Sequence, residues 1–422
     1  MTAADPSRAE SGGSVWRNSR FVRYWLATTV SGTGTSVSLV AIPLLAISKL
    51  HATDSDVGLL RMAEMLPYLV LSVPAGIVAD RVRRRSLLAA ADLSRFVLVG
   101  AGPLLYRMRF LPLPVLMAVM GGVGCFTVTY DVSQFALLPA LVGEDKLVDA
   151  NSGLESARGG ATSLGPSLGG VLVSGFGPVN AVLADACSYF YSGLTFLTMR
   201  HAEHPPPRDA AGSPERPHVL DGVRFVMGTP LLRYLTAYLG LNNFVVQAVL
   251  TAALLFLVHV LALPPYAVGL AMGAYGAGFL AGAVLARPLG RALGAGKLLA
   301  ASSLLGGAGI AVVASAPSRT SPGAVISLVT VVLGMALAGL AGPLFNVHAA
   351  TLRLRATPRD RLGRVTAAVK LCSQGTVAAG AAAGGLLAGA AGPRAALFAL
   401  GAASLATTVL LLPAPVRRAR TR

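Results

Sequence analysis

The chain has 422 residues, of which 54% are hydrophobic and only 13% are charged. Soluble domains carry about 25% charged residues, so this composition excludes an ordinary soluble protein and indicates a polytopic membrane protein. The formal net charge is +17. Because the sequence contains no basic helix or finger motif, we expect no nucleic-acid partner, and we place the positive charge in loops beside an anionic membrane surface.

A membrane-spanning helix needs about 20 predominantly apolar residues. By that rule the sequence predicts an all-α polytopic fold with twelve transmembrane helices in two six-helix bundles. The predicted spans are 21–48, 57–79, 87–106, 111–138, 148–174, 178–199, 230–257, 266–288, 296–316, 323–347, 363–390 and 393–413. The predicted domains are a tail at 1–20, a bundle at 21–199, a connector at 200–229, a bundle at 230–413 and a basic tail at 414–422. Within the connector we expect a short amphipathic helix near Val219–Met227.

The distribution of positive charge predicts the orientation of these spans. If the N-terminus lies inside, the loops assigned to the outside contain only Lys49, Arg107, Arg109, Arg319 and Arg394 of the 35 Lys and Arg residues. Most of the others fall in the inside segments, as the positive-inside rule requires. We therefore expect a multi-pass protein of a bacterial inner membrane with both termini in the cytoplasm.

The two predicted bundles show traces of an internal repeat. Short matches recur in the same order at a nearly constant distance along the chain: Arg23-Tyr24 with Arg233-Tyr234, Gly76 and Arg81 with Gly282 and Arg287, and Gly165, Gly169 and Gly170 with Gly380, Gly384 and Gly385. Three ordered matches favour a parallel duplication of one six-helix unit.

A short basic break separates the second and third predicted spans. Gly76 is followed by Asp80-Arg81 and then by Arg84-Arg85. This pattern resembles the loop motif of the major facilitator superfamily, although Arg83 stands where the family usually has a glycine. The resemblance implies that Gly76, Asp80, Arg81 and Arg84 form a conformational latch with Asp131 of the fourth helix. The alternative is a solvated loop that only sets topology.

The fifth predicted span contains a second motif. Gly165-Pro166-Ser-Leu-Gly169-Gly170 resembles the fifth-helix motif of drug and proton antiporters in the same superfamily, and this resemblance favours export over import. The alternative is ordinary close packing of a glycine-rich helix. Near the eleventh span, Thr357-Pro358 followed by Gly363-Arg364-Val365 resembles a segment of a bacterial branch that includes macrolide and siderophore exporters.

Charged residues inside the spans are candidate cavity residues, because each costs about 2.5–3.5 kcal/mol at a helix centre. The candidates for a proton or substrate cavity are Arg61, Glu64, Glu155, Arg158, Asp185 and Lys370. Arg61 with Glu64, Asp92 with Arg95, and Glu155 with Arg158 are spaced three apart, so each pair can neutralise itself on its own helix. Asp185 and Lys370 have no such partner, and Glu155 can instead pair with Lys370 across the bundles.

Proton coupling needs a buried carboxylate that senses both sides in turn. From the sequence we rank Glu64 first as the titrating group and Asp131 first as a latch residue. The chain has no phosphate-binding Gly-x-x-x-x-Gly-Lys-Ser/Thr motif and no catalytic or metal-binding constellation. We therefore expect neither an enzyme nor an ATP-driven pump, and no cofactor or metal.

The sequence as a whole predicts a secondary active transporter that works by alternating access as a monomer in the lipid bilayer. The favoured function is proton-coupled efflux of an amphiphilic small molecule, such as a drug, an antibiotic or a siderophore-like natural product. We therefore expect an antiporter that confers multidrug resistance. Two alternatives remain open at this stage. One is uptake of a metabolite, and the other is a non-transporting sensor or scaffold on the same fold.

Overall fold

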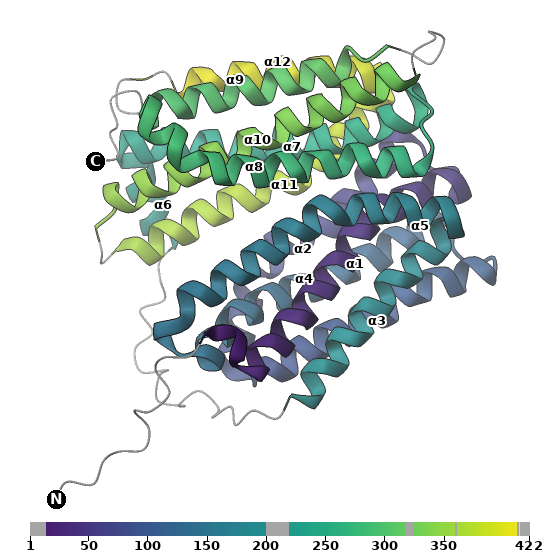
Figure 1. The fold of residues 1–422 in the computed structure, drawn as a ribbon, viewed down its shortest axis with the longest axis horizontal. Coiled ribbons are helices and arrows are strands. Elements are labelled where there is room, and N and C mark those ends of the chain that lie inside the picture. Colours follow the sequence, from purple (N-terminus) through teal and green to yellow (C-terminus); the bar gives the residue numbers. More distant parts are fainter. Residues whose placement is uncertain (1–13, 200–218, 318–323, 359–360, 412, 414–422) are drawn as a thin grey trace, which may run out of the picture.

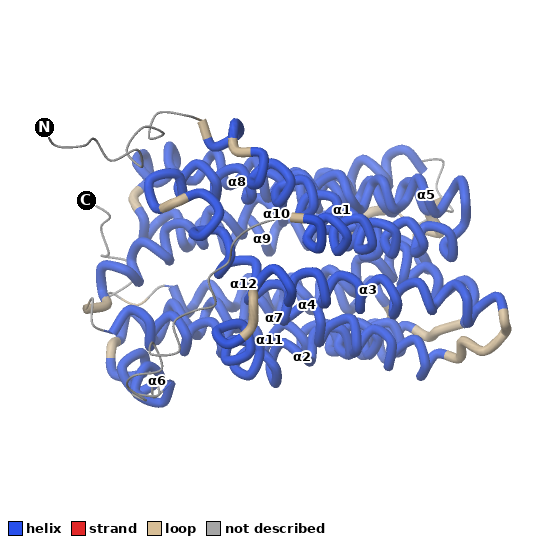
Figure 2. The backbone as a smooth tube through the Cα atoms, turned by 90° about the horizontal axis from the view of Figure 1, so that it is seen from below, coloured by secondary structure: helices blue, strands red, loops and turns tan. Residues whose placement is uncertain are grey.

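The computed structural model describes residues 14–199, 219–317, 324–358, 361–411 and 413. Every regular element in these residues is a helix, and most helices run along the long axis of the molecule (Figures 1 and 2). Nine of the helices found there are long and apolar enough to cross a membrane. The predicted helical membrane fold is therefore confirmed, whereas the count of twelve spans and the domain boundaries stay predictions.

The helices follow the predicted spans closely. Their bounds are α1 Ser19–Leu50, α2 Asp54–Arg81, α3 Arg84–Arg107, α4 Leu113–Val142, α5 Leu147–Thr198, α6 Val219–Gly228, α7 Pro230–Leu255, α8 Pro265–Leu293, α9 Ala295–Ala314, α10 Ala324–Ala356, α11 Leu362–Ala391 and α12 Pro393–Thr407. A π-helical turn, Phe256–Val260, extends α7. We call α1–α5 the first half and α7–α12 the second half.

Local sequence signals explain several helix ends. The side chain of Asn18 accepts hydrogen bonds from the first backbone N–H groups of α1, and Thr53 with Asp56 forms a capping box at the start of α2. The label α5 covers two helical stretches, because Gly177 has φ 79° and ψ 162° and interrupts the helix. Only glycine adopts this conformation without strain, so a single residue makes the turn between the predicted fifth and sixth spans.

The basic loop is shorter than the sequence suggests. Residues 80–86 lie between the predicted spans 57–79 and 87–106, but α2 continues through Arg81 and α3 begins at Arg84. Charged residues with good helix propensity can extend a helix beyond its apolar part, and only Val82 and Arg83 remain between the two helices. We call the end of the molecule that carries this loop the basic end, and the end where α1 gives way to α2 the opposite end.

The two halves meet through α5 with α8 and α2 with α11 (Figure 1). The largest apolar core joins residues of both halves, for example Leu45 and Val57 with Val268 and Ala388. None of the four smaller apolar clusters joins the two halves, and one of them also includes residues of α6. The shared core thus holds the halves together, and Figure 1 shows the helices diverging toward the basic end.

The connector contributes one described helix, α6, at the predicted position. Its residue Val226 is buried against Val365 and Val369 of α11. An added Cβ at Gly222 would lie 2.3 Å from the backbone oxygen of Arg364, so glycine allows α6 to rest directly on the first turn of α11. The connector is therefore anchored to a helix of the contact between the halves.

Candidate functional site

A polar cavity of about 270 Å³ lies inside the first half, among α1, α2, α3, α4 and α5. Its lining includes the hydroxyl, amide and charged groups of Thr28, Thr35, Tyr68, Arg95, Tyr130, Asp131, Gln134 and Arg158. Two predicted site residues, Asp131 and Arg158, thus face one cavity. Polar groups of this kind inside a membrane-spanning bundle are typical of a substrate or ion pathway.

Arg95 is the buried cation of this cavity, with 3% of its surface exposed. It forms an ion pair with Asp92, which is fully buried one turn earlier on α3. Its guanidinium also lies over the ring of Tyr130 from α4, at 4.3 Å, and over the ring of Tyr189 from α5, at 4.4 Å. An acid and two aromatic faces therefore offset the loss of hydration that burial of this charge imposes.

Asp131 is bound to α2 in this structure. The phenolic hydroxyl of Tyr68 donates a hydrogen bond of 2.6 Å to its carboxylate. The neighbouring Tyr130 donates a longer hydrogen bond, 3.4 Å, to Thr28 of α1. The side chain of Asp80 lies outside the described part of the structure, so the predicted latch between Asp80, the loop arginines and Asp131 stays a prediction.

Asp185 lies in the second stretch of α5 and is 1% exposed. Its carboxylate accepts a hydrogen bond of 2.5 Å from Ser38 of α1 and one of 3.4 Å from Ser188. Gly34 of α1 makes room for it, since an added Cβ there would lie 2.6 Å from the carboxylate. Among the described residues no Lys, Arg or His forms an ion pair with Asp185.

The other predicted charges form pairs within their own helices. Glu64 accepts a 3.1 Å bond from Arg61, and both side chains are half-buried. Glu155 lies 3.8 Å from Arg158, and both are exposed. Lys370 is also exposed, and within the described residues the pair across the bundles between Glu155 and Lys370 is not formed. The three pairs predicted from i,i+3 spacing are all present.

The glycine–proline motif of α5 lies at contacts with both halves. An added Cβ at Gly165 would lie 2.3 Å from Ser36 of α1, and one at Gly169 would lie 2.7 Å from the backbone oxygen of Val37. Gly170 faces the second half, where an added Cβ would lie 2.4 Å from the backbone oxygen of Pro265. The motif therefore packs α5 closely on α1 and on α8 at once.

Polar contacts join the two halves at the opposite end. His259, in the π-helical turn after α7, lies 2.6 Å from Asp54 at the start of α2. The backbone N–H of Tyr266 donates a 3.0 Å hydrogen bond to Ser174. Gly58 of α2 is also pressed against the backbone of Gly385, so the two halves are in close contact at the opposite end.

Sequence reasoning assigned no role to Tyr68, Tyr189 or Ser38, and it treated Arg95 only as half of a self-neutralising pair. One signal was available: Tyr189 follows Asp185 by four positions, so both side chains lie on one helix face. Tyr68 and Ser38 gave no local signal, because their partners lie 63 and 147 residues away along the chain.

Comparison with known proteins agrees with this geometry. The family model of transmembrane secretion effectors, a group of the major facilitator superfamily, matches residues 11–421. The chain is 27% identical to the uncharacterized MFS-type transporter YfiS of Bacillus subtilis, over 89% of this chain and 88% of that protein. It is 28% identical to the multidrug efflux pump Tap of Mycolicibacterium fortuitum, over 50% of this chain and 52% of Tap.

Among solved structures, the fold is similar to that of a bacterial homologue of the iron transporter ferroportin in its inward-facing state. The TM-score is 0.71 with 18% identity, and the match covers 95% of this chain and 99% of the other. The sequence match spans nearly the whole chain, and the structural match shows the same fold. The chain therefore belongs to the transmembrane secretion effector family and is a secondary transporter of the major facilitator superfamily.

Proposed function

We propose that the protein exports an amphiphilic small molecule in exchange for protons. Asp185 carries this proposal: it is a carboxylate buried among membrane-spanning helices that only neutral hydroxyl donors contact within hydrogen-bond distance. Among the described residues no Lys, Arg or His forms an ion pair with this carboxylate, so a proton can bind to it without breaking an ion pair. Glu64, by contrast, accepts a 3.1 Å bond from Arg61, so a cation is already bonded to its carboxylate.

Polar side chains on α1 lie near both Asp185 and the cavity. Thr35, which lines the cavity, forms a 2.8 Å hydrogen bond with the hydroxyl of Tyr189, one turn beyond Asp185 on the same helix. Ser38, the donor to Asp185, lies on α1 as Thr35 does. We infer that a proton reaches Asp185 through this face of α1 and that its binding alters the packing of α1 on α5.

Two comparisons support export rather than uptake. The matching family is described as a secretion effector family, and the partial relative Tap is a multidrug efflux pump. The glycine–proline motif of α5, which the sequence links to antiporters, lies at the contact between the halves. In this proposal the basic end faces the cytoplasm, and the structure corresponds to the state that binds substrate from the cytoplasm before export.

The test is accumulation of dyes and antibiotics in bacteria that express the chain, with and without a protonophore. We expect lower accumulation in expressing cells, and we expect the protonophore and Asp185→Asn each to abolish the difference. Asp145→Asn, which changes an exposed carboxylate next to α5, is the matched control and should leave export intact. Export that survives both Asp185→Asn and the protonophore would contradict proton coupling, and unchanged accumulation across a broad panel would contradict multidrug export.

A further inference from the structure

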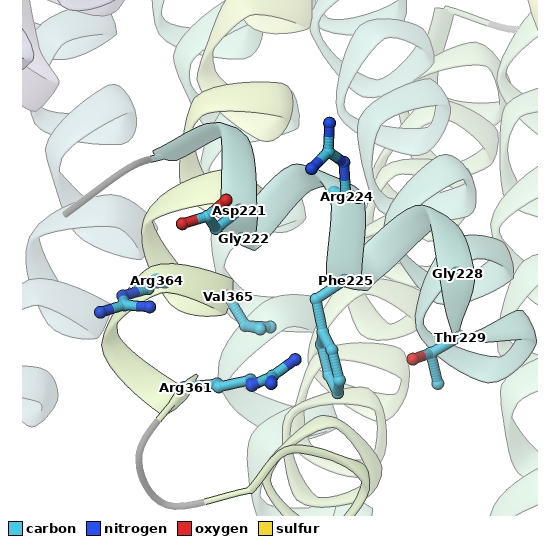
Figure 3. Close-up of a pocket in the computed structure, with 9 residues that line it drawn as sticks. All are labelled: Asp221, Gly222, Arg224, Phe225, Gly228, Thr229, Arg361, Arg364 and Val365. Carbon is cyan, nitrogen blue, oxygen red and sulfur yellow. The ribbon is translucent and has the colours of Figure 1, made fainter.

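A second cavity lies outside the transport path, at the basic end, between the connector helix α6 and the start of α11. Its volume is about 440 Å³. Three arginines line it: Arg224 of α6, Arg361 just before α11, and Arg364 in the first turn of α11. One acid, Asp221, lines it as well (Figure 3). The transport mechanism proposed above uses none of these residues.

The cavity has the electrostatic character of an anion site. Its lining carries three guanidinium groups against one carboxylate, so its formal charge is positive. The α11 N-terminus adds to this field: the N-cap residue is Arg361, its side chain caps no backbone N–H, and the helix runs for 30 residues. The partial positive charge at the start of a long helix favours a bound anion.

Packing holds one arginine in place. The guanidinium of Arg361 lies 5.2 Å from the centre of the Phe225 ring on α6, and Figure 3 shows it reaching toward that ring. The contact of Gly222 with the backbone of Arg364 fixes α6 against α11. In Figure 3 the side chains of Arg224 and Arg364 point in different directions from that of Arg361.

The surroundings place this cavity at the level of a membrane surface. The other face of α6 borders an apolar groove of about 520 Å³, lined by Val226, Leu241, Phe244 and Ala368 among others. A helix with one apolar face toward a groove and one polar face toward basic groups is typical of the boundary between the acyl and head-group regions. Clusters of arginine at that depth match the phosphate groups of anionic lipids.

We propose that the cavity between α6 and α11 binds a phosphate-bearing anion, supplied either by an anionic phospholipid head group or by a soluble phosphate compound. Arg361 and Arg364 are the principal ligands, since guanidinium groups can grip phosphate oxygens through two hydrogen bonds each. The position at the membrane surface favours the lipid. A bound phosphate ties the connector to α11, a helix of the contact between the two halves.

The experiment measures the thermal midpoint of the purified full chain in a neutral detergent at fixed ionic strength. The chain is titrated separately with short-chain phosphatidylglycerol, with phosphatidylcholine and with inorganic phosphate. A ligand that binds the folded state raises the midpoint in proportion to the logarithm of its concentration above Kd. We expect a saturable rise with phosphatidylglycerol that exceeds the rise with phosphatidylcholine.

Two double variants that each remove two positive charges test whether the phosphate binds in this cavity. Arg361→Gln with Arg364→Gln should weaken the apparent affinity at least tenfold. Arg291→Gln with Lys297→Gln, which changes exposed residues outside the cavity at the same end, should change the affinity less than twofold. A third variant, Arg361→Lys with Arg364→Lys, keeps the charge and should give an intermediate loss of apparent affinity. It still tests the site if the glutamine variant folds poorly.

The outcomes distinguish a lipid head group from a soluble phosphate compound, and they also show when the proposed site is wrong. A response to phosphatidylglycerol alone identifies a lipid head group, and a response to inorganic phosphate as well identifies a site for small phosphate anions. Equal losses in the two glutamine variants, a response without saturation, or an equal rise with phosphatidylcholine would each overturn the proposal in favour of diffuse charge. None of these results depends on whether the chain exports drugs.

Discussion

The imidazole Nδ1 of His259 lies 2.6 Å from the carboxylate oxygen of Asp54, across the contact between the two halves. Among the described residues this is the only ion pair that joins them, and it forms when the imidazole is protonated. The π-helical turn Phe256–Val260 carries His259 to the end of the bundle. The pair therefore stabilises the arrangement in which the opposite end is closed.

Asp54→Asn should weaken closure of the opposite end. Both side chains are partly exposed, so the pair contributes about 1 kcal/mol, which is about a fivefold change in the equilibrium between states. The measurement is disulfide formation between cysteines introduced at Ser55 and Gly389, which are in contact, with the native cysteines replaced by serine. We expect slower cross-linking in Asp54→Asn, and no change in Lys49→Gln, an exposed residue of the same end. Equal cross-linking in both would contradict a gating role.

Tyr68→Phe should shift the protein away from the state seen here. The substitution keeps the ring and removes the 2.6 Å hydrogen bond to Asp131, and a bond to a charged group contributes about 1.5 kcal/mol, or about a tenfold shift. If Asp131 joins the predicted latch in the other state, Asp80→Asn should shift the equilibrium in the opposite direction. Solvent access of a cysteine placed on α11 near the basic end measures the fraction of the protein that is in the state seen here. Tyr191→Phe, an exposed tyrosine, is the control, and shifts of the same sign in both test variants would refute the latch.

Arg95→Gln should destabilise the first half strongly. It leaves the carboxylate of Asp92 fully buried without its ion pair, and breaking a buried pair costs about 3–5 kcal/mol. The double variant Asp92→Asn with Arg95→Gln should recover part of this loss, because no lone charge remains. Thermal unfolding of the four proteins in detergent gives the coupling between the two sites. Simple additivity of the two single losses would contradict the proposed pairing.

Gly170→Val should impair transport, whereas Gly175→Val on the same helix should not. A side chain at Gly170 meets the backbone of Pro265 and Gly269, at 2.4 and 2.9 Å from its Cβ, and forces α5 away from α8. A side chain at Gly175 meets nothing within 4 Å. Transport and Ser55–Gly389 cross-linking in the two variants check this, and equal activity would show that the glycine–proline motif does not act through close packing.

The sequence alone determined the features that depend on residues close together along the chain. Apolar runs of membrane length predicted the helices, because a helix in lipid satisfies its own backbone hydrogen bonds. Spacing by three predicted the pairs Arg61–Glu64 and Asp92–Arg95, which the structure shows, since such neighbours share a helix face. The motifs at Gly76–Arg85 and Gly165–Gly170 identified the superfamily, which the family match confirms.

Only the tertiary structure decided which of these groups meet. The bonds of Ser38 to Asp185, Tyr68 to Asp131 and His259 to Asp54 join helices far apart along the chain. Their distances depend on how whole helices rotate and pack, which no local pattern specifies. From the sequence we ranked Glu64 first as the titrating carboxylate, and that rank stays a prediction. We propose Asp185 instead because the structure shows its hydrogen bonds to Ser38 and Ser188, which join helices or turns whose contacts the sequence does not specify.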